Sequence, residues 1–149
     1  MHGMPTYLID GHNLLYAARQ GFLDHLVDGH PGGAAREDLV RCLVATFVDA
    51  DQAVFLYFDG SEATTEIRSA RVQVIYPGGP GDQRADAAIL RHVAQLAAAG
   101  EGTPIIVVTR DLKLARRARK RGAGVIAPGE FLAAKVIRAA PATPVGRAP

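Results

Sequence analysis

The chain has 149 residues, of which 48% are hydrophobic, so it can bury one core in a single domain. This composition excludes a wholly disordered chain, and no apolar run approaches the roughly 20 residues that a membrane-spanning helix needs. The N-terminus lacks a basic region followed by an apolar stretch, so no signal peptide is predicted. The single cysteine, Cys42, lies among apolar residues at helical spacing and is predicted to be a buried, inert thiol. Together these features predict a soluble, cytoplasmic protein.

The predicted elements alternate between strands and helices along the chain. Short apolar segments predict strands at residues 6–9, 53–58, 72–76, 104–108 and, more weakly, 124–126. Helical patterns are predicted at residues 13–19, 36–50, 82–99, 110–121 and 128–138. Continuous apolar strands between helices indicate a mainly parallel sheet covered on both faces, which is a three-layer α/β/α fold. The domain is expected to span residues 1–140, followed by a Pro- and Ala-rich disordered tail at 141–149.

Aspartates follow three of the predicted strands. Asp10 and Asp59 come directly after their strands, and Asp111 follows the 104–108 strand after Thr109 and Arg110. Because the carboxyl ends of parallel strands share one edge of a sheet, these three side chains are expected to gather there. A single aspartate in such a place is commonly a turn former or a helix cap. Three together would repel one another, and a bound cation would relieve that repulsion.

The helix predicted at 82–99 adds a fourth carboxylate. Asp86 lies on the apolar stripe of this helix, one turn before its core-facing residues, and Asp82 lies one turn earlier still. An unpaired carboxylate that faces a core is costly, so Asp86 is predicted to join the strand-end aspartates, whereas Asp82 is explained best as the helix N-cap. An all-oxygen acidic cluster suits Mg²⁺ or Mn²⁺ better than Zn²⁺, with Asp82 as a further candidate ligand.

Four motifs surround these acids and occur in a fixed order along the chain. They are Leu8-Ile9-Asp10-Gly11-His12-Asn13-Leu14-Leu15, Phe58-Asp59-Gly60, Ala85-Asp86-Ala87-Ala88-Ile89 and Val107-Val108-Thr109-Arg110-Asp111. Together they resemble the NYN-domain nucleases, and most closely the YacP-like family within the wider PIN-like fold. The resemblance extends over about residues 6–126. It implies a metal-dependent endoribonuclease, a hydrolase that cleaves RNA phosphodiester bonds with Mg²⁺ or Mn²⁺.

The resemblance also implies roles for single residues. It places metal-binding and catalytic roles on the four acids, which are Asp10, Asp59, Asp86 and Asp111. Asn13 is implied as a polar positioning residue beside them, and Thr109 matches a Thr or Ser often found before the last acid. Arg110 departs from the family pattern, which often has Ser there. Asp82 matches only approximately a second acid that is common before the Ala-Asp pair.

A strongly basic segment follows the last motif. Seven of the twelve residues from Arg110 to Arg121 are basic. Such a run is usually a solvated helix face, but beside an acidic metal site it is also suited to hold the phosphates of RNA. The predicted RNA contacts are Arg84, Arg110, Lys113, Arg116 and Arg117. An RNA–protein assembly such as the ribosome is a further candidate partner, and the sequence leaves the oligomeric state open.

Two other functions stay open at this point. In an aspartyl-phosphate phosphoryl-transfer protein, Asp10, Thr109 and Lys113 would form the working set. His12 stands where the phosphatases of that kind need a second aspartate, and Asp10 lacks the neighbouring acid of a receiver domain. A non-catalytic RNA-binding or regulatory module with the same fold is the other alternative, and the complete set of four aspartates argues against it. A toxin-type nuclease of the PIN group remains a variant of the main hypothesis.

Overall fold

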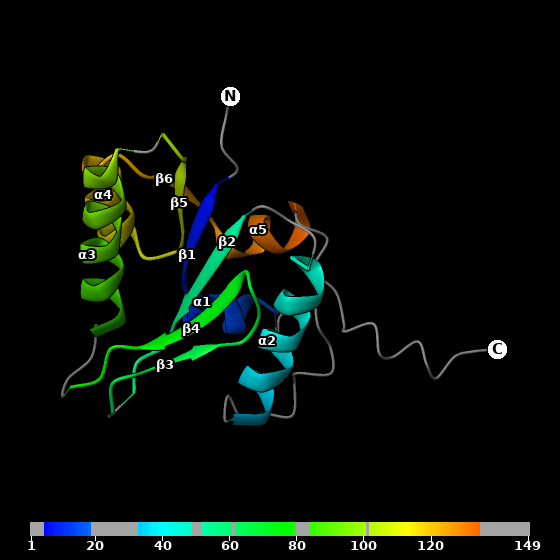
Figure 1. Ribbon diagram of the computed structural model, residues 1–149. Helices are drawn as coiled ribbons and strands as arrows, with labels where there is room; N and C mark the ends of the chain where they lie inside the picture. Colours follow the sequence, from blue (N-terminus) through cyan, green and yellow to red (C-terminus); the bar gives the residue numbers. More distant parts are fainter. Residues whose placement is uncertain are drawn as a thin grey trace.

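The computed structural model of the protein describes residues 5–18, 33–48, 52–60, 62–79, 84–100 and 102–134. These residues form a six-stranded sheet in the order β3-β4-β2-β1-β5-β6, in which only the edge strand β3 is antiparallel to its neighbour. The strands are β1 (Thr6–Asp10), β2 (Ala53–Tyr57), β3 (Thr64–Ile67), β4 (Val72–Tyr76), β5 (Ile105–Val108) and β6 (Gly124–Ile126). The helices are α1 (Gly11–Ala17), α2 (Gly33–Thr46), α3 (Arg84–Ala99), α4 (Leu112–Lys120) and α5 (Pro128–Ala134). Figure 1 shows α3 and α4 on one side of the sheet and α1, α2 and α5 on the other. The predicted three-layer, mainly parallel α/β fold is therefore confirmed.

The strand predictions agree closely with the structure, and one strand was missed. Strands 72–76 and 124–126 are confirmed end to end, whereas β1 extends one residue further and includes Asp10. The missed strand is β3, whose four residues are all exposed and show no alternation of apolar and polar side chains. The predicted starts of the helices at 13 and 36 were wrong, because α1 begins at Gly11 and α2 at Gly33; α2 also ends at Thr46, before the predicted end at 50. Asp82 and the tail 141–149 lie outside the described residues.

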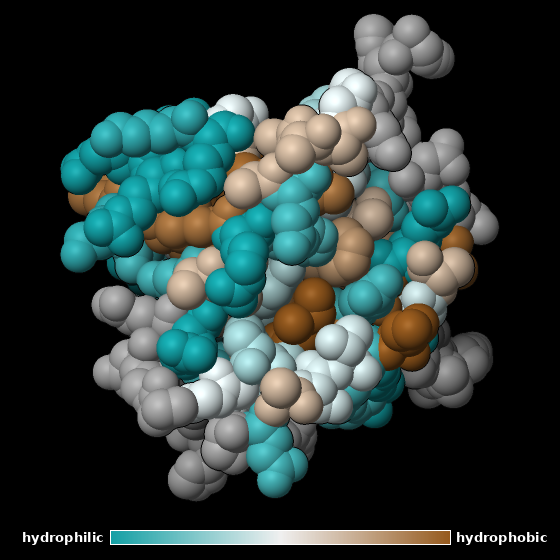
Figure 2. Space-filling model, turned by 60° about the vertical axis from the view of Figure 1, so that its left-hand side comes forward, coloured by the Kyte–Doolittle hydropathy of each residue, from teal (hydrophilic) through white to brown (hydrophobic). Residues whose placement is uncertain are grey.

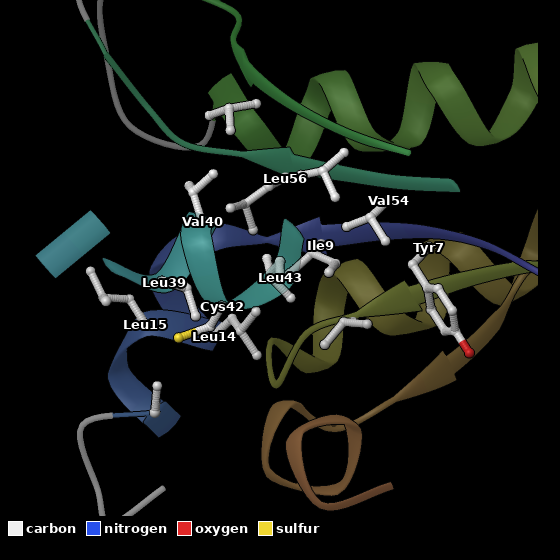
Figure 3. Close-up of a cluster of buried hydrophobic side chains, with 14 of the residues drawn as sticks. Tyr7, Ile9, Leu14, Leu15, Leu39, Val40, Cys42, Leu43, Val54 and Leu56 are labelled. Carbon is white, nitrogen blue, oxygen red and sulfur yellow. The ribbon is translucent and has the colours of Figure 1, made fainter. Parts of the chain in front are cut away.

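The sheet separates two hydrophobic cores. Ile9 packs into the core under α1, α2 and α5, whereas its neighbour Leu8 packs into the core under α3 and α4, because successive side chains of a strand point to opposite faces. Figure 3 shows the first core, where Cys42 is buried as the sequence predicted. By the same alternation Asp10 shares the face of Leu8, and Thr109 shares the face of Val107, toward α3 and α4. No helix among the described residues is long and apolar enough to cross a membrane.

The turn from β1 into α1 is tightly packed at Gly11. A Cβ atom at this position would lie 2.6 Å from Cε1 of Phe58 and 2.6 Å from the carbonyl oxygen of Tyr57. Glycine is therefore required if the start of α1 is to pack against the residues that follow β2. This close approach brings the segment after Asp10 alongside the segment that carries Asp59.

The strands β1 and β5 lie side by side at the centre of the sheet, and the chain leaves their carboxyl ends in opposite directions. From β1 it continues to β2 on one side, and from β5 it continues to β6 on the other. Such a reversal of strand order opens a crevice beyond the sheet edge, which is where ligands bind in folds of this type. Asp10 ends β1, and Thr109 and Asp111 follow β5, so the predicted site lies at this crevice.

Candidate functional site

Each of the three strand-end aspartates holds the first turn of a helix. Oδ1 of Asp10 accepts the N–H of Asn13 at 3.4 Å, at the start of α1. Oδ1 of Asp111 accepts two backbone N–H groups at the start of α4, at 2.8 and 3.1 Å. Oδ1 of Asp59 accepts the N–H of Ala85 at 2.8 Å, in the first turn of α3. The ordinary capping role of aspartate after a strand therefore applies to all three residues.

Thr109 joins the ends of β1 and β5. Its side chain is 2% exposed, and its Oγ1 lies 3.2 Å from Oδ2 of Asp10 and 3.1 Å from Oδ1 of Asn13. The same hydroxyl oxygen accepts the N–H of Asp111 at 3.1 Å. Oδ1 of Asn13 also accepts the N–H of Arg110 at 2.7 Å. The structure thus brings together Asn13 and Thr109, both singled out in the sequence, as residues that hold Asp10 and the start of α4 in fixed positions.

Asp86 differs from the other three acids. It is half-buried in the first turn of α3, and no described residue donates a hydrogen bond to its carboxylate or forms an ion pair with it. Burial, together with the charges of Asp10, Asp111 and Asp59, raises the pKa of Asp86 to about 6. Each of the other three acids is thus near enough to Asp86 for its charge to act on the Asp86 carboxylate.

The pKa of Asp10 is also raised, because its carboxylate is buried. The N–H of Asn13 and the hydroxyl of Thr109 oppose this effect by donating to the charged form, and the charge of His12 acts in the same direction. The charge of Asp111 adds to the rise in pKa. Asp10 is therefore an acid whose negative charge is costly but partly compensated, whereas among the described residues nothing lowers the pKa of Asp86.

Several carboxylate oxygens of the site are free. Among the described residues, Oδ2 of Asp59, Oδ2 of Asp111 and both oxygens of Asp86 accept no hydrogen bond. Cys42 lies in the opposite core, and the imidazole of His12 stands edge-on to the ring of Phe58 with centroids 5.5 Å apart. No three His, Cys, Asp or Glu side chains in the described ranges are already placed to coordinate an ion together. The acids therefore surround the crevice without closing into a finished ligand set.

A cleft of about 170 Å³ opens beside Asp86, between α3 and α4. Its polar lining consists of Asp86, Asp111, Lys113 and Arg117, and apolar parts of both helices complete it. Figure 2, in which the side of the molecule that carries α3 and α4 is turned forward, shows many hydrophilic side chains on this face. Two predicted metal ligands and two predicted RNA contacts therefore share one opening.

The other predicted RNA contacts lie in different places. Arg116 is exposed on α4 but does not line the cleft. Arg84 is exposed at the start of α3, and its Nε donates to the carbonyl oxygen of Gly78 at 3.2 Å. Arg110 is exposed, and its guanidinium carbon lies 5.5 Å from the centre of the Tyr16 ring. The sequence interpretation did not include Tyr16, although its position three residues after Asn13 on a helix indicates a place near the site.

Comparison with known proteins identifies the family. The chain matches the family model of the YacP-like NYN domain over residues 7–141. It belongs to this family. Membership supports a nuclease, RNA-related function for this YacP-like domain and confirms the resemblance seen in the four motifs.

Solved structures show the same fold. The crystal structure of the W164L mutant of Rae1 (YacP) from Bacillus subtilis has a TM-score of 0.66 and 22% identity, covering 88% of this chain and 74% of that one. The crystal structure of Rae1 (YacP) from Bacillus subtilis has a TM-score of 0.63 and 22% sequence identity, covering 89% of this chain and 74% of that one. No curated protein sequence matches this chain. At this level of identity the likeness concerns the fold.

Proposed function

We propose that this YacP-like NYN domain is an endoribonuclease that depends on Mg²⁺ or Mn²⁺ and cleaves RNA phosphodiester bonds at its four aspartates. The observation that carries the proposal is the state of Asp86. Its carboxylate is half-buried and feels the charges of three other carboxylates, and among the described residues no N–H group donates to it and no basic side chain forms an ion pair with it. The three strand-end acids are explained by helix capping, whereas Asp86 lies in the first turn of α3 without accepting a capping hydrogen bond from the described residues. A bound metal cation would compensate the charge of Asp86 and so account for an acid at this position.

The donor set favours a hard divalent cation. The free oxygens belong to Asp59, Asp86 and Asp111, and Mg²⁺ and Mn²⁺ prefer such carboxylate ligands over the His and Cys that Zn²⁺ prefers. Asp10 and Asp86 would be the central ligands, with Asp59 and Asp111 beside them. When bound, such an ion supplies an activated water near neutral pH and neutralises charge on the phosphate.

The remaining residues of the site position the acids and the substrate. Thr109 and Asn13 hold the Asp10 carboxylate in one orientation through the hydrogen bonds at 3.2 and 3.4 Å. Lys113 and Arg117 line the cleft beside Asp86, where they would hold the phosphates of an RNA strand on either side of the cleaved bond. The positive charges of Lys113 and Arg117 thus offset the repulsion between an anionic substrate and an acidic site.

Single-turnover cleavage of a panel of single-stranded RNAs tests the proposal. We expect cleavage with Mg²⁺ or Mn²⁺, none with EDTA, and a rate at least about 100-fold lower in Asp10→Asn and in Asp86→Asn. Glu130→Gln is the matched control, because Glu130 is an exposed acid on α5 that is not among the charges acting on Asp86. Cleavage at the wild-type rate by Asp86→Asn in Mg²⁺ would refute the proposal.

The same assays separate the two alternatives. Binding of Mn²⁺ without cleavage of any RNA would favour the non-catalytic RNA-binding module. Formation of an aspartyl phosphate on incubation with acetyl phosphate would favour phosphoryl transfer. The cytoplasmic localisation and a partner such as the ribosome remain predictions from the sequence.

A further inference from the structure

An exposed aromatic ring lies next to the acidic crevice and is not used by the proposed reaction. Tyr16, on α1, is 53% exposed, and the guanidinium group of Arg110 lies over its ring at 5.5 Å. The described residues contain few large apolar side chains with this degree of exposure, and Leu112, next to Asp111, is another at 75%. Two of these exposed apolar side chains therefore flank the acids, on segments that follow β1 and β5.

The ring and the guanidinium are held close to the acids by the backbone. The N–H of Arg110 donates to Oδ1 of Asn13 at 2.7 Å, and Tyr16 lies one helical turn after Asn13. Asn13 is in turn within hydrogen-bonding distance of Thr109, which contacts Asp10. The backbone of Arg110 and the start of α1, which carry these two side chains, are thus held near Asp10 by the same short chain of hydrogen bonds that orients the carboxylate.

The pair has the chemistry of a surface that stacks a nucleobase. Bases of single-stranded nucleic acids stack on aromatic rings, and Arg adds cation–π and planar stacking contacts. Bases inside a duplex are paired and stacked on each other, so they are not offered to such a surface. The cleft that Lys113 and Arg117 line lies between α3 and α4, on the opposite side of the sheet from α1. Its basic side chains are suited to contact phosphates and not bases.

We propose that Tyr16 and Arg110 form a subsite that stacks one base of a single-stranded RNA next to the cleaved phosphate. The proposal rests on the ribonuclease function and deepens it, because it names the strand state of the substrate. A single-stranded RNA is held on the α1 side of the crevice by a base and on the α4 side by its phosphates. Duplex RNA, which offers phosphates but no free base, gains nothing from the pair.

A fluorescent variant reports directly on the subsite. The chain has no tryptophan, so Tyr16→Trp introduces a single indole at the proposed stacking surface. We expect its fluorescence to be quenched when a single-stranded oligoribonucleotide binds in EDTA, which blocks cleavage. Ile67→Trp is the matched control, because Ile67 is 74% exposed on the edge strand β3, away from β1 and β5 in the sheet. Equal quenching in the two variants would overturn the proposal.

Binding measurements test the role of the base itself. Tyr16→Ala should weaken the binding of single-stranded RNA by about 10-fold, whereas Tyr16→Phe, which keeps the ring, should bind as the wild type does. An RNA that lacks the base at the stacked position should bind the wild type about as weakly as intact RNA binds Tyr16→Ala. Duplex RNA should bind all three proteins equally. The comparison of intact and abasic RNA needs only the wild-type protein, so it holds even if a variant folds poorly.

The outcomes for the subsite and for the nuclease are distinguishable. If Tyr16→Ala binds and cleaves as the wild type does while Asp86→Asn has lost cleavage, the subsite is refuted and the ribonuclease function stands. If the wild type cleaves no RNA of the panel, the ribonuclease function fails, and this subsite fails with it. If cleavage depends on Asp86 and the abasic RNA binds about 10-fold more weakly than intact RNA, both are supported.

Discussion

The two sides of the acidic crevice hold their carboxylates in opposite ways. On the β1 and β5 side, Asp10 and Asp111 accept hydrogen bonds from helix amides, and Asp10 also accepts one from Thr109, so these contacts offset part of the cost of burying the Asp10 charge. On the α3 side, Asp86 is half-buried without such contacts from the described residues, and its charge opposes folding. The acids of one site can therefore be divided into those that cap helices and one, Asp86, for which only ligand binding provides a role. Substitutions on the two sides should therefore change stability with opposite signs.

The largest effect on stability is expected at the hydrogen-bonded side. Thr109→Val keeps the shape of the side chain but leaves the buried Asp10 carboxylate and the N–H of Asp111 without their partner. We expect a loss of about 1–3 kcal/mol in the free energy of unfolding, measured by urea denaturation. Thr109→Ser keeps the hydroxyl and is the control. If the valine variant is as stable as the wild type, the hydrogen bonds on this side contribute nothing and the comparison fails.

The opposite sign is expected at Asp86. Its pKa is raised from 3.8 to about 6 in the folded state, so between these pH values the folded protein binds the proton more tightly than the unfolded chain does. The wild type should therefore lose stability as pH rises through this window, and Asp86→Asn should not. At pH 7 in EDTA we expect Asp86→Asn to melt about 2–4 °C higher than the wild type, which corresponds to roughly 1 kcal/mol in the free energy of unfolding. The expected effect is kept this small because solvent partly screens the charge of Asp86.

Two controls accompany the Asp86 measurement. Near pH 4 the melting temperatures of wild type and Asp86→Asn should converge, because Asp86 is then protonated in the folded protein. Addition of Mg²⁺ or Mn²⁺ at pH 7 should stabilise the wild type more than the variant, since the ion binds the folded site. A wild type that is more stable than Asp86→Asn in EDTA at pH 7 would contradict the idea of an uncompensated acid.

The smallest effect concerns the cations on the α3 and α4 side. Arg117 lines the cleft beside Asp86, whereas Arg116 is exposed on α4 outside it. Arg117→Glu should weaken RNA binding and make the fall of log K with log salt concentration less steep by about 1 in slope, because one phosphate contact is lost. Arg116→Glu, one residue away on the same helix, should have less effect on both. Equal effects of the two reversals would show that the whole helix face, and not the cleft, attracts RNA.

Much of this arrangement could be predicted from the sequence, because the decisive patterns are local. Apolar strands such as 72–76 and the helical phase that places Asp86 near the core each depend on a few neighbouring residues. The edge strand β3 could not be predicted in this way, because Thr64–Ile67 is exposed on all sides and becomes a strand only by pairing with β4. The ring of Tyr16 could not be placed on Arg110 either, since that contact requires the packing of β1 beside β5.

The capping of three helices by three acids has a consequence for evolution. The first turns of α1, α3 and α4 all point at the crevice, and the partial positive charge of each helix start favours the aspartate that caps it. A relative that had lost its activity would still benefit from Asp10, Asp59 and Asp111 through the stability of these helices. It would gain stability by replacing the acid at position 86. Retention of Asp86, and not of the more conspicuous strand-end acids, is therefore the feature that should separate working members of the family from inactive ones.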